Sequence, residues 1–324
     1  MHDGLAHNPA GGERVMTLSV LPEALTVENT VQVSGVRHRL ALGVQWVDAV
    51  SQLSVGNGWV SDLDAIGTRP CPLRFDVHPR GRHALRAAGR LAKLLALAAA
   101  DKIAMPPPTV EDDQTNFVLR AYSRRSARVE RYTTGNDARR YVPRRLSLTP
   151  VQTDGIPTIQ ADNIRDAWAW PGSAFPLASK VTALRGWVRR GANEASAKPV
   201  AWPRIAITQP GMGPPNFATE VNLGFAHGDD RGEFLAVLGP DSVPGGVVLP
   251  PAITLRIWVF LPPPDLFDPA DPLASLPLEV AGTAAISDVT RGTAVPAGYL
   301  QQNSFDVIVA PGRVVTIDKA KLLF

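Results

Sequence analysis

Residues 181–190 read Val-Thr-Ala-Leu-Arg-Gly-Trp-Val-Arg-Arg, and residues 198–207 read Lys-Pro-Val-Ala-Trp-Pro-Arg-Ile-Ala-Ile. Apolar residues recur in both runs at a period close to two, as expected of β-strands with one buried face. A polar turn at Gly191–Ala197 separates the runs. Strands that follow one another across short turns are typical of an antiparallel sandwich. These two runs therefore predict a β-sandwich in the second half of the chain.

The same pattern predicts further strands downstream. A turn rich in Gly and Asp precedes the next apolar run, and Pro311-Gly312 is a turn between the last two. The strands expected from these runs are Glu233–Leu238, Ile253–Phe260, Leu276–Val280, Ser304–Ala310 and Arg313–Ile317. The sandwich would therefore extend to residue 324.

The order of these runs resembles the carboxypeptidase regulatory-like (transthyretin-like) β-sandwich. That family carries Val-x-Gly-x-Val, then Pro-Val-x-x-Ala-x-Val, and later an Asp/Gly turn before Glu/Arg-Phe-x-Leu. The matching residues are Leu184–Val188, Pro199–Ile207 and Ala226–Leu238, within residues 181–260. Trp202-Pro203 departs from the pattern and suggests an edge strand or a bulge. The resemblance implies a seven-stranded sandwich without catalytic residues of its own, used as a structural or interaction module.

The first half of the chain is expected to be β-rich with one surface helix. Apolar runs at Arg39–Val50 and Phe117–Tyr132 predict strands. Residues 81–102 are dense in Ala and Leu, the strongest helix formers, and Met105–Pro108 would end a helix there. The fold predicted for the whole chain is thus mainly β, with two β-sandwich-type domains, a helix at about 81–102 and long Pro-rich extended segments.

Two groups of basic residues are candidates for interaction. Arg82, Arg86 and Arg90 would form one stripe on the expected helix, either a solvated face or a docking surface for an acidic partner or nucleic acid. Arg124, Arg125 and Arg128 belong to an Arg-rich stretch with interleaved Tyr residues at 120–145. That stretch is open to three interpretations: a protein interface, a nucleic-acid surface or a solvated strand face.

Apolar residues supply the other candidates. Residues 151–180 are irregular in pattern and predict a linker or wrapping segment with a short helix near Ala161–Ala169. Trp168 and Trp170 within it would either plug the junction between domains or form a carbohydrate-stacking platform. The final residues Leu322, Leu323 and Phe324 are apolar and are expected to dock on the sandwich or on a neighbour.

Composition and charge fit a folded chain of two unequal halves. Hydrophobic residues make up 45% of the 324 residues, enough for packed cores. The net charge is +3, but residues 1–150 carry 20 Lys and Arg against 14 Asp and Glu, and the remainder carry 13 against 16. We expect a flexible arm at 1–15, a β-rich domain at 16–150, the linker at 151–180 and the sandwich at 181–324.

No catalytic or metal-binding template is present in the sequence. There is no Gly-x-Ser-x-Gly, His-Glu-x-x-His or phosphate-binding loop, and one cysteine excludes an internal disulfide framework. His227 beside Asp229 is more typical of a turn than of an acid–base group. Asp265, Asp268 and Asp271 precede or adjoin prolines, which favours extended turns over a calcium site. We expect no enzyme activity, no catalytic residue, no metal and no cofactor.

These features favour a structural or interaction subunit. Extended arms, Pro-rich connections and an apolar end are typical of chains that gain order against other subunits. We expect an oligomeric or particle-associated protein, such as a component of a phage-tail-like or contractile injection particle, assembled in the cytoplasm without a membrane span. The alternatives are a carbohydrate-binding β-sandwich module and an Arg-rich accessory protein that binds nucleic acid.

Overall fold

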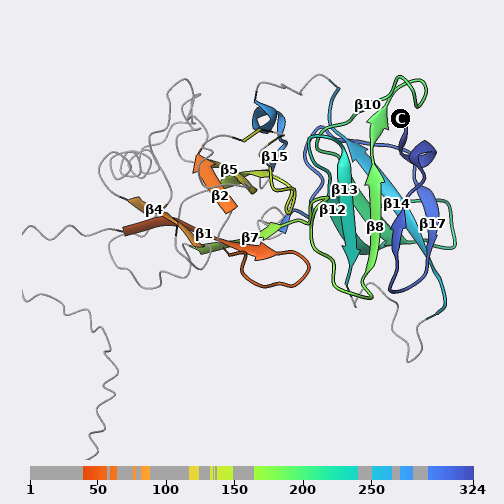
Figure 1. The fold of residues 1–324 in the computed structure, drawn as a ribbon, viewed down its shortest axis with the longest axis horizontal. Helices are drawn as coiled ribbons and strands as arrows, with labels where there is room; N and C mark the ends of the chain where they lie inside the picture. The colour runs from red at the N-terminus through yellow and green to blue at the C-terminus, as the bar shows by residue number, and fades with distance from the viewer. Residues whose placement is uncertain are drawn as a thin grey trace, which may run out of the picture. The chain divides into compact units, whose positions relative to one another are not determined.

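A computed structural model describes most of the second half of the chain and parts of the first. The described residues are 39–56, 59–63, 76–77, 82–87, 117–123, 132–133, 135, 137–148, 164–239, 250–264, 271–279 and 291–324. All of them belong to one compact unit, His38–Phe324. The described part is mainly β, as the sequence predicts, with strands in several sheets (Figure 1). The expected division at 150–181 stays a prediction.

Two four-stranded sheets come mostly from the first half. In the first sheet the strand order is β3 (Asp76–Val77), β4 (Arg82–Ala87), β1 (Arg39–Asp48), β7 (Ile164–Ala169). In the second it is β15 (Leu278–Glu279), β6 (Arg144–Leu148), β5 (Phe117–Ser123), β2 (Trp59–Leu63). The pairs β1–β7 and β15–β6 are parallel and the others are antiparallel.

Two helices expected from composition are strands where the structure describes them. The start of the predicted helix 81–102 is β4, which pairs with β1 on one side and β3 on the other. Residues 88–102 of that helix lie outside the described residues. The short helix expected near Ala161–Ala169 is wrong, because Ile164–Ala169 is β7. Local Ala-rich composition favours helix only weakly, and ladder pairing with β1 overrides it in both places.

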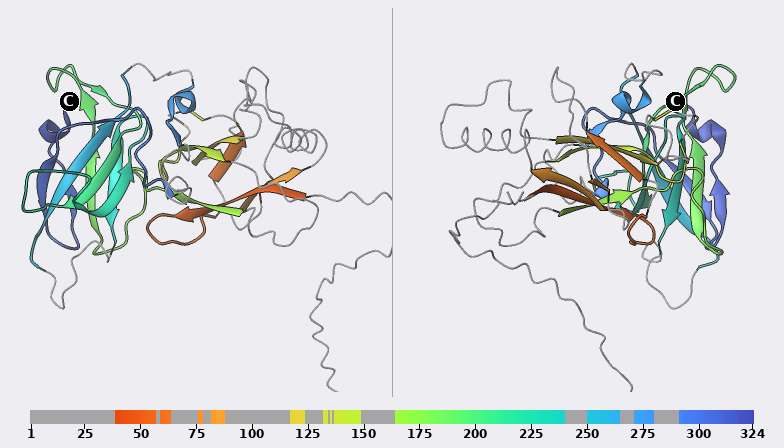
Figure 2. Two further views of the ribbon diagram at one scale, coloured as in Figure 1. Left: turned by 180° about the vertical axis from the view of Figure 1, so that it is seen from behind. Right: turned by 60° about the vertical axis from the view of Figure 1, so that its left-hand side comes forward.

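The sandwich is built from two facing sheets (Figure 1 and, from two further directions, Figure 2). One holds β13 (Glu233–Leu238), β8 (Thr182–Trp187) and β18 (Val314–Thr316), in that order. The other holds β12 (Val221–His227), β11 (Arg204–Gln209) and β14 (Ile253–Leu261), with β16 (Leu300–Gln301) and β17 (Phe305–Val309) both paired to β14. A separate pair joins β9 (Arg189–Arg190) to β10 (Lys198–Pro199). Two short 3-10 helices are η4 (Pro272–Ser275) and η5 (Lys319–Leu322).

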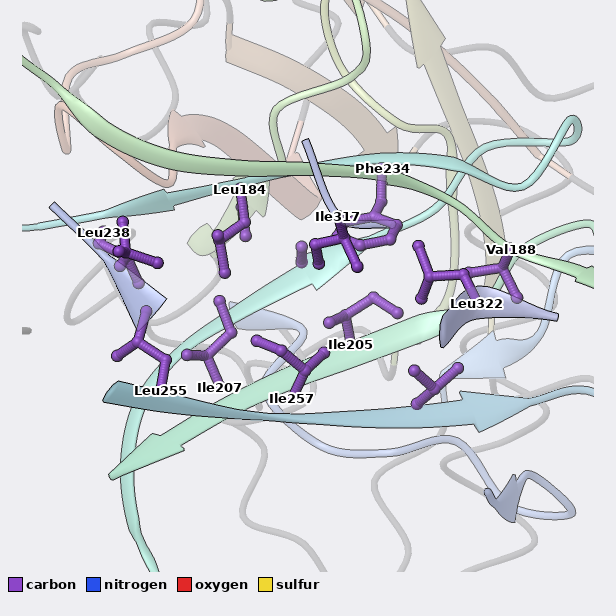
Figure 3. Close-up of a cluster of buried hydrophobic side chains, with 14 of the residues drawn as sticks. Leu184, Val188, Ile205, Ile207, Phe234, Leu238, Leu255, Ile257, Ile317 and Leu322 are labelled. Carbon is purple, nitrogen blue, oxygen red and sulfur yellow. The ribbon is translucent and has the colours of Figure 1, made fainter. Parts of the chain in front are cut away.

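The core lies between the two sheets, as Figure 3 shows. Leu184 and Phe234 come from one sheet, and Ile205, Ile207 and Ile257 from the other. Alternate residues of β14 point away from this core, and there Trp258 and Phe260 pack in a second cluster with Phe217, Phe225 and Tyr299. Because both faces of β14 are covered, its sequence is an almost unbroken apolar run.

Glycine is required at one position of the family-like strand. A Cβ atom on Gly186 would lie 2.4 Å from Cε1 of Phe234 and 2.5 Å from Cδ1 of Leu322. Both neighbours belong to the main core. The glycine in the Leu184-x-Gly186-x-Val188 run therefore leaves room for the Phe234 ring and for the Leu322 side chain.

Candidate functional site

A pocket of about 490 Å³ opens at the β9–β10 end of the sandwich. Most of its lining is apolar, and three prolines of the connection after β14 form one wall. Its lining residues are Arg190, Lys198, Pro199, Val200, Ala201, Trp202, Asp230, Pro262, Pro263, Pro264 and Ser275. A cavity of this volume, mostly apolar with few polar groups, has the character of a ligand-binding pocket.

The pocket lies where the predicted strand 198–207 is broken. Its first two residues are β10, its last part is β11, and the chain bends at Trp202-Pro203 between them. Trp202 has φ of 59°, a left-handed conformation that is strained for a residue with a side chain. The sequence suggests an edge strand or a bulge at Trp202-Pro203; the structure has a bend there instead, and β11 beyond it is a central strand between β12 and β14.

Several contacts hold the Trp202 side chain in the pocket wall. Its indole Nε1 donates to Oγ of Ser275 at 2.9 Å, and that hydroxyl donates to the Pro272 carbonyl at 2.7 Å. Its backbone N–H donates to the Asp229 carbonyl at 2.9 Å. The ring is 1% exposed and packs with Tyr122, Leu273 and others in a buried cluster. The indole is thus a fixed wall of the pocket.

The mouth of the pocket carries two cations. Arg190 and Lys198 stand directly opposite each other in the β9–β10 pair. Arg190 donates to the Pro262 carbonyl at 3.4 Å. Neither side chain forms an ion pair with a carboxylate of the described residues. Glu194, the one acidic residue of the segment 189–199, pairs with Arg189 at 3.2 Å.

Buried acidic groups lie behind the pocket. Asp229 accepts the backbone N–H groups of Arg231 at 2.9 Å and Glu233 at 3.0 Å, and burial raises the pKa of its carboxyl. Asp137 accepts from the Ser123 hydroxyl at 3.2 Å and, through burial, has its pKa raised to about 6. No three metal-ligating side chains among the described residues are placed to hold a metal ion. The acidic groups therefore belong to the turn and the packing around it.

A second buried polar cluster joins the sandwich to β6 and β15. Glu279 accepts two hydrogen bonds from Arg144, at 3.1 and 2.5 Å, and one from Arg204 at 3.4 Å. His227 bonds the Gly292 carbonyl through Nε2 at 2.8 Å and stacks on Trp170, with ring centroids 5.0 Å apart. Burial lowers the pKa of His227 well below its ordinary value, and the two nearby arginines add to this.

His227 is consequently a neutral packing residue. The sequence placed it in a turn, but it ends β12 and is fully enclosed. Among the residues that the structure describes, its ring bonds a backbone carbonyl and stacks on the Trp170 face. No carboxylate orients it and no nucleophile is bonded to it in the described part of the chain, which leaves it without an acid–base arrangement.

Of the two tryptophans of the expected linker, Trp170 is buried in the protein and Trp168 is partly exposed. Trp170 donates through Nε1 to the Arg291 carbonyl at 2.7 Å and is buried against His227. Trp168 is half-buried, 5.9 Å from the Trp170 ring, with the Arg291 guanidinium 5.6 Å from its own centroid. These rings fill the region between β7 and the sandwich, so Trp170 has no open face on which a sugar could stack.

The apolar final residues pack on their own sandwich. Leu322 is fully buried in the main core, so it is not available to a partner. Leu323 and Phe324 run parallel to β9: the Phe324 N–H donates to the Arg189 carbonyl at 3.0 Å, and the Phe324 carbonyl accepts from Gly191 at 2.9 Å. The sequence left open whether these residues pack on the sandwich or on a neighbouring molecule, and in the structure they pack on the sandwich.

The basic candidates are largely outside the described residues. Arg82 is exposed on β4 and donates to Oε1 of Gln45 at 2.8 Å, and Arg86 is on the same strand. The others, Arg90, Arg124, Arg125 and Arg128, lie outside the described ranges. The sequence did not indicate Arg190 and Lys198 as site residues. They face each other only because of the register in which β9 pairs with β10, and no sequence motif reveals that register.

Comparison with known proteins adds no relative. No protein-family model, no curated protein and no solved structure matches the chain. In the described residues, no helix is long and apolar enough to cross a membrane. The pocket and the exposed strands of the sandwich are therefore the features that bear on function.

Proposed function

We propose that this chain is a non-enzymatic structural subunit of a larger bacterial protein assembly, such as a phage-tail-like or contractile injection particle. The observation that carries the proposal is the open edge of each sheet. β17 pairs only with β14, and β18 only with β8, among the described strands. Their large apolar residues Ile308 and Val314 are 70% and 47% exposed.

Exposed apolar side chains on edge strands are costly for a free monomer. Such edges offer unpaired backbone groups to another chain, and soluble monomers usually cover them or charge them. Here the two edges are joined by the tight turn at Gly312, which has φ of 77°. A neighbouring subunit that adds a strand or an apolar face at this place would cover both edges together.

The resemblance to the carboxypeptidase regulatory-like sandwich is part of the proposal. The two facing sheets hold eight described strands, namely β8, β13 and β18 in one and β11, β12, β14, β16 and β17 in the other, against the seven that the resemblance implies. Domains of that class serve as appended structural or interaction modules. The two facing sheets support such a role, and the buried side chains of Glu279 and His227 bond to other parts of the same protein.

Size analysis of the native complex tests this proposal. The tagged chain is purified from its host, and co-elution in a megadalton particle is expected. The double variant Ile308→Lys/Val314→Lys should leave the particle, whereas the control Leu53→Lys, at a loop residue that is 69% exposed, should remain in it. A clean monomer of 34.7 kDa for the unaltered chain would refute the proposal.

A further inference from the structure

We propose that the pocket at the β9–β10 pair binds an extended peptide segment of a partner protein, one that carries an acidic side chain between apolar or proline residues. This site is separate from the edge strands β17 and β18, so the two proposals stand on different residues. Two cations, Arg190 and Lys198, lie at the pocket mouth.

The placement of these cations is unfavourable in the chain alone. Like charges directly opposite each other across a strand pair destabilise it. The segment 189–199 holds one acid, Glu194, and its carboxylate pairs with Arg189 and lies 4.0 Å from Lys319. Arg190 and Lys198 are therefore left without an ion pair in the described structure. An anionic group held between them would remove the repulsion and gain charge-assisted hydrogen bonds.

Two other polar side chains line the pocket, Ser275 and Asp230. The Ser275 hydroxyl accepts from Trp202 and donates to Pro272. Asp230 is buried and precedes Arg231 in the chain. Burial acts to lower the pKa of the Arg231 guanidinium, but the carboxylates of Asp229 and Asp230 outweigh it and raise that pKa. The lining therefore holds two cations, Arg190 and Lys198, against one carboxylate, and this net positive charge favours an anionic ligand.

The shape and lining favour a peptide over a small inorganic anion. A volume of about 490 Å³ is in the range of cavities that enclose ligands of many atoms. Pro199 and the prolines 262–264 offer rigid apolar surface, which is the kind of surface that holds extended and proline-rich segments. β10 pairs only with β9 in the described part, so its outer edge lies open beside the pocket.

The test is a peptide selection on paired variants of the full chain. A displayed library of random 12-residue peptides is selected on the unaltered protein and on Arg190→Glu/Lys198→Glu. Asp or Glu flanked by apolar residues should be enriched on the unaltered protein alone. A matched control, Arg185→Glu/Arg313→Glu, reverses two exposed cations away from the pocket and should enrich the same peptides as the unaltered protein.

Fluorescence anisotropy with the enriched peptide then gives the affinities. Replacement of its acid by the amide, or reversal of both mouth cations, should weaken binding at least tenfold, while the control variant should stay within twofold. Equal enrichment on all three proteins, no enrichment on any, or an amide peptide that binds as well as the acid would overturn the proposal.

A stability measurement separates loss of binding from loss of folding. Lys198→Glu alone converts the like-charge pair into an opposite-charge pair, so its melting temperature should rise above that of Lys198→Gln while peptide binding falls in both. If Lys198→Glu loses both stability and binding, Lys198 supports the hairpin rather than the ligand, and the proposal fails.

Discussion

The buried carboxyl of Asp137 makes the stability of this protein depend on pH in an unusual direction. Asp137 is 1% exposed and accepts hydrogen bonds from the Ser123 hydroxyl and the Arg139 backbone N–H. Burial raises its pKa from 3.8 to about 6, and the carboxylates of Asp230 and Asp229 add to the rise. The folded state therefore holds this proton more tightly than the unfolded state does.

The sign and size of the effect follow from linkage. Below pH 3.8 the carboxyl is protonated in both states and does not change the free energy of unfolding. As the pH rises from 3.8 to about 6, the unfolded state loses the proton first, and the free energy of unfolding falls. Each unit of pKa difference is worth about 1.4 kcal/mol, so ionised Asp137 lowers the free energy of unfolding by about 3 kcal/mol at pH 8. At pH 4.5 the cost is only about 1 kcal/mol.

The substitution Asp137→Asn removes this cost. The amide oxygen can still accept from Ser123 and Arg139, but it carries no charge at any pH. Urea denaturation should show the variant more stable than the unaltered protein by up to about 3 kcal/mol at pH 8 and by about 1 kcal/mol at pH 4.5. The exposed Asp166→Asn serves as the control and should leave both values within about 0.5 kcal/mol. A gain at pH 8 no larger than at pH 4.5, or a loss, would refute the reasoning.

Three further substitutions test the packing. Glu279→Gln leaves two buried arginines without their carboxylate and should cost about 3–5 kcal/mol by urea denaturation; a loss under 1 kcal/mol would contradict a structural role for that cluster. Gly186→Ala drives a Cβ into the Phe234 ring and should cost about 1–3 kcal/mol, seen as a lower melting temperature, whereas an unchanged value would mean that the core can yield there. Leu322→Ala should lower the free energy of unfolding by about 2–5 kcal/mol, whereas Leu300→Ala, at an exposed residue, should change it by less than about 0.5 kcal/mol. Equal losses would show that the final residues are not part of the core.

The sandwich strands could be predicted because their own residues decide their structure. The apolar run Ile253–Phe260 predicts β14, and the turn at Pro311-Gly312 between two further apolar runs predicts β17 and β18. The strand β4 could not be predicted, since Ala and Leu at 82–87 favour helix until β1 and β3 pair with them.

The pocket could be predicted only in part. Trp202-Pro203 signals a break in the strand, and the structure has a bend there. The opposition of Arg190 and Lys198 depends on the register across Gly191–Ala197, which a turn of that length does not specify. The burial of His227 depends on Gly292, a residue distant in sequence, so its neighbours in the chain gave no sign of it.

The parallel pairing of β18 with β8 has a consequence for synthesis. Val315 lies opposite Leu184, so strands about 130 residues apart must meet before the smaller sheet is complete, a long-range contact of the kind that slows folding. A ribosome adds roughly 5–20 residues per second, which leaves β8 and β13 exposed for several seconds at least. During that interval the nascent sandwich is a half-open apolar surface, and a chaperone or a partner subunit that holds it would act before Ile317 and Leu322 arrive.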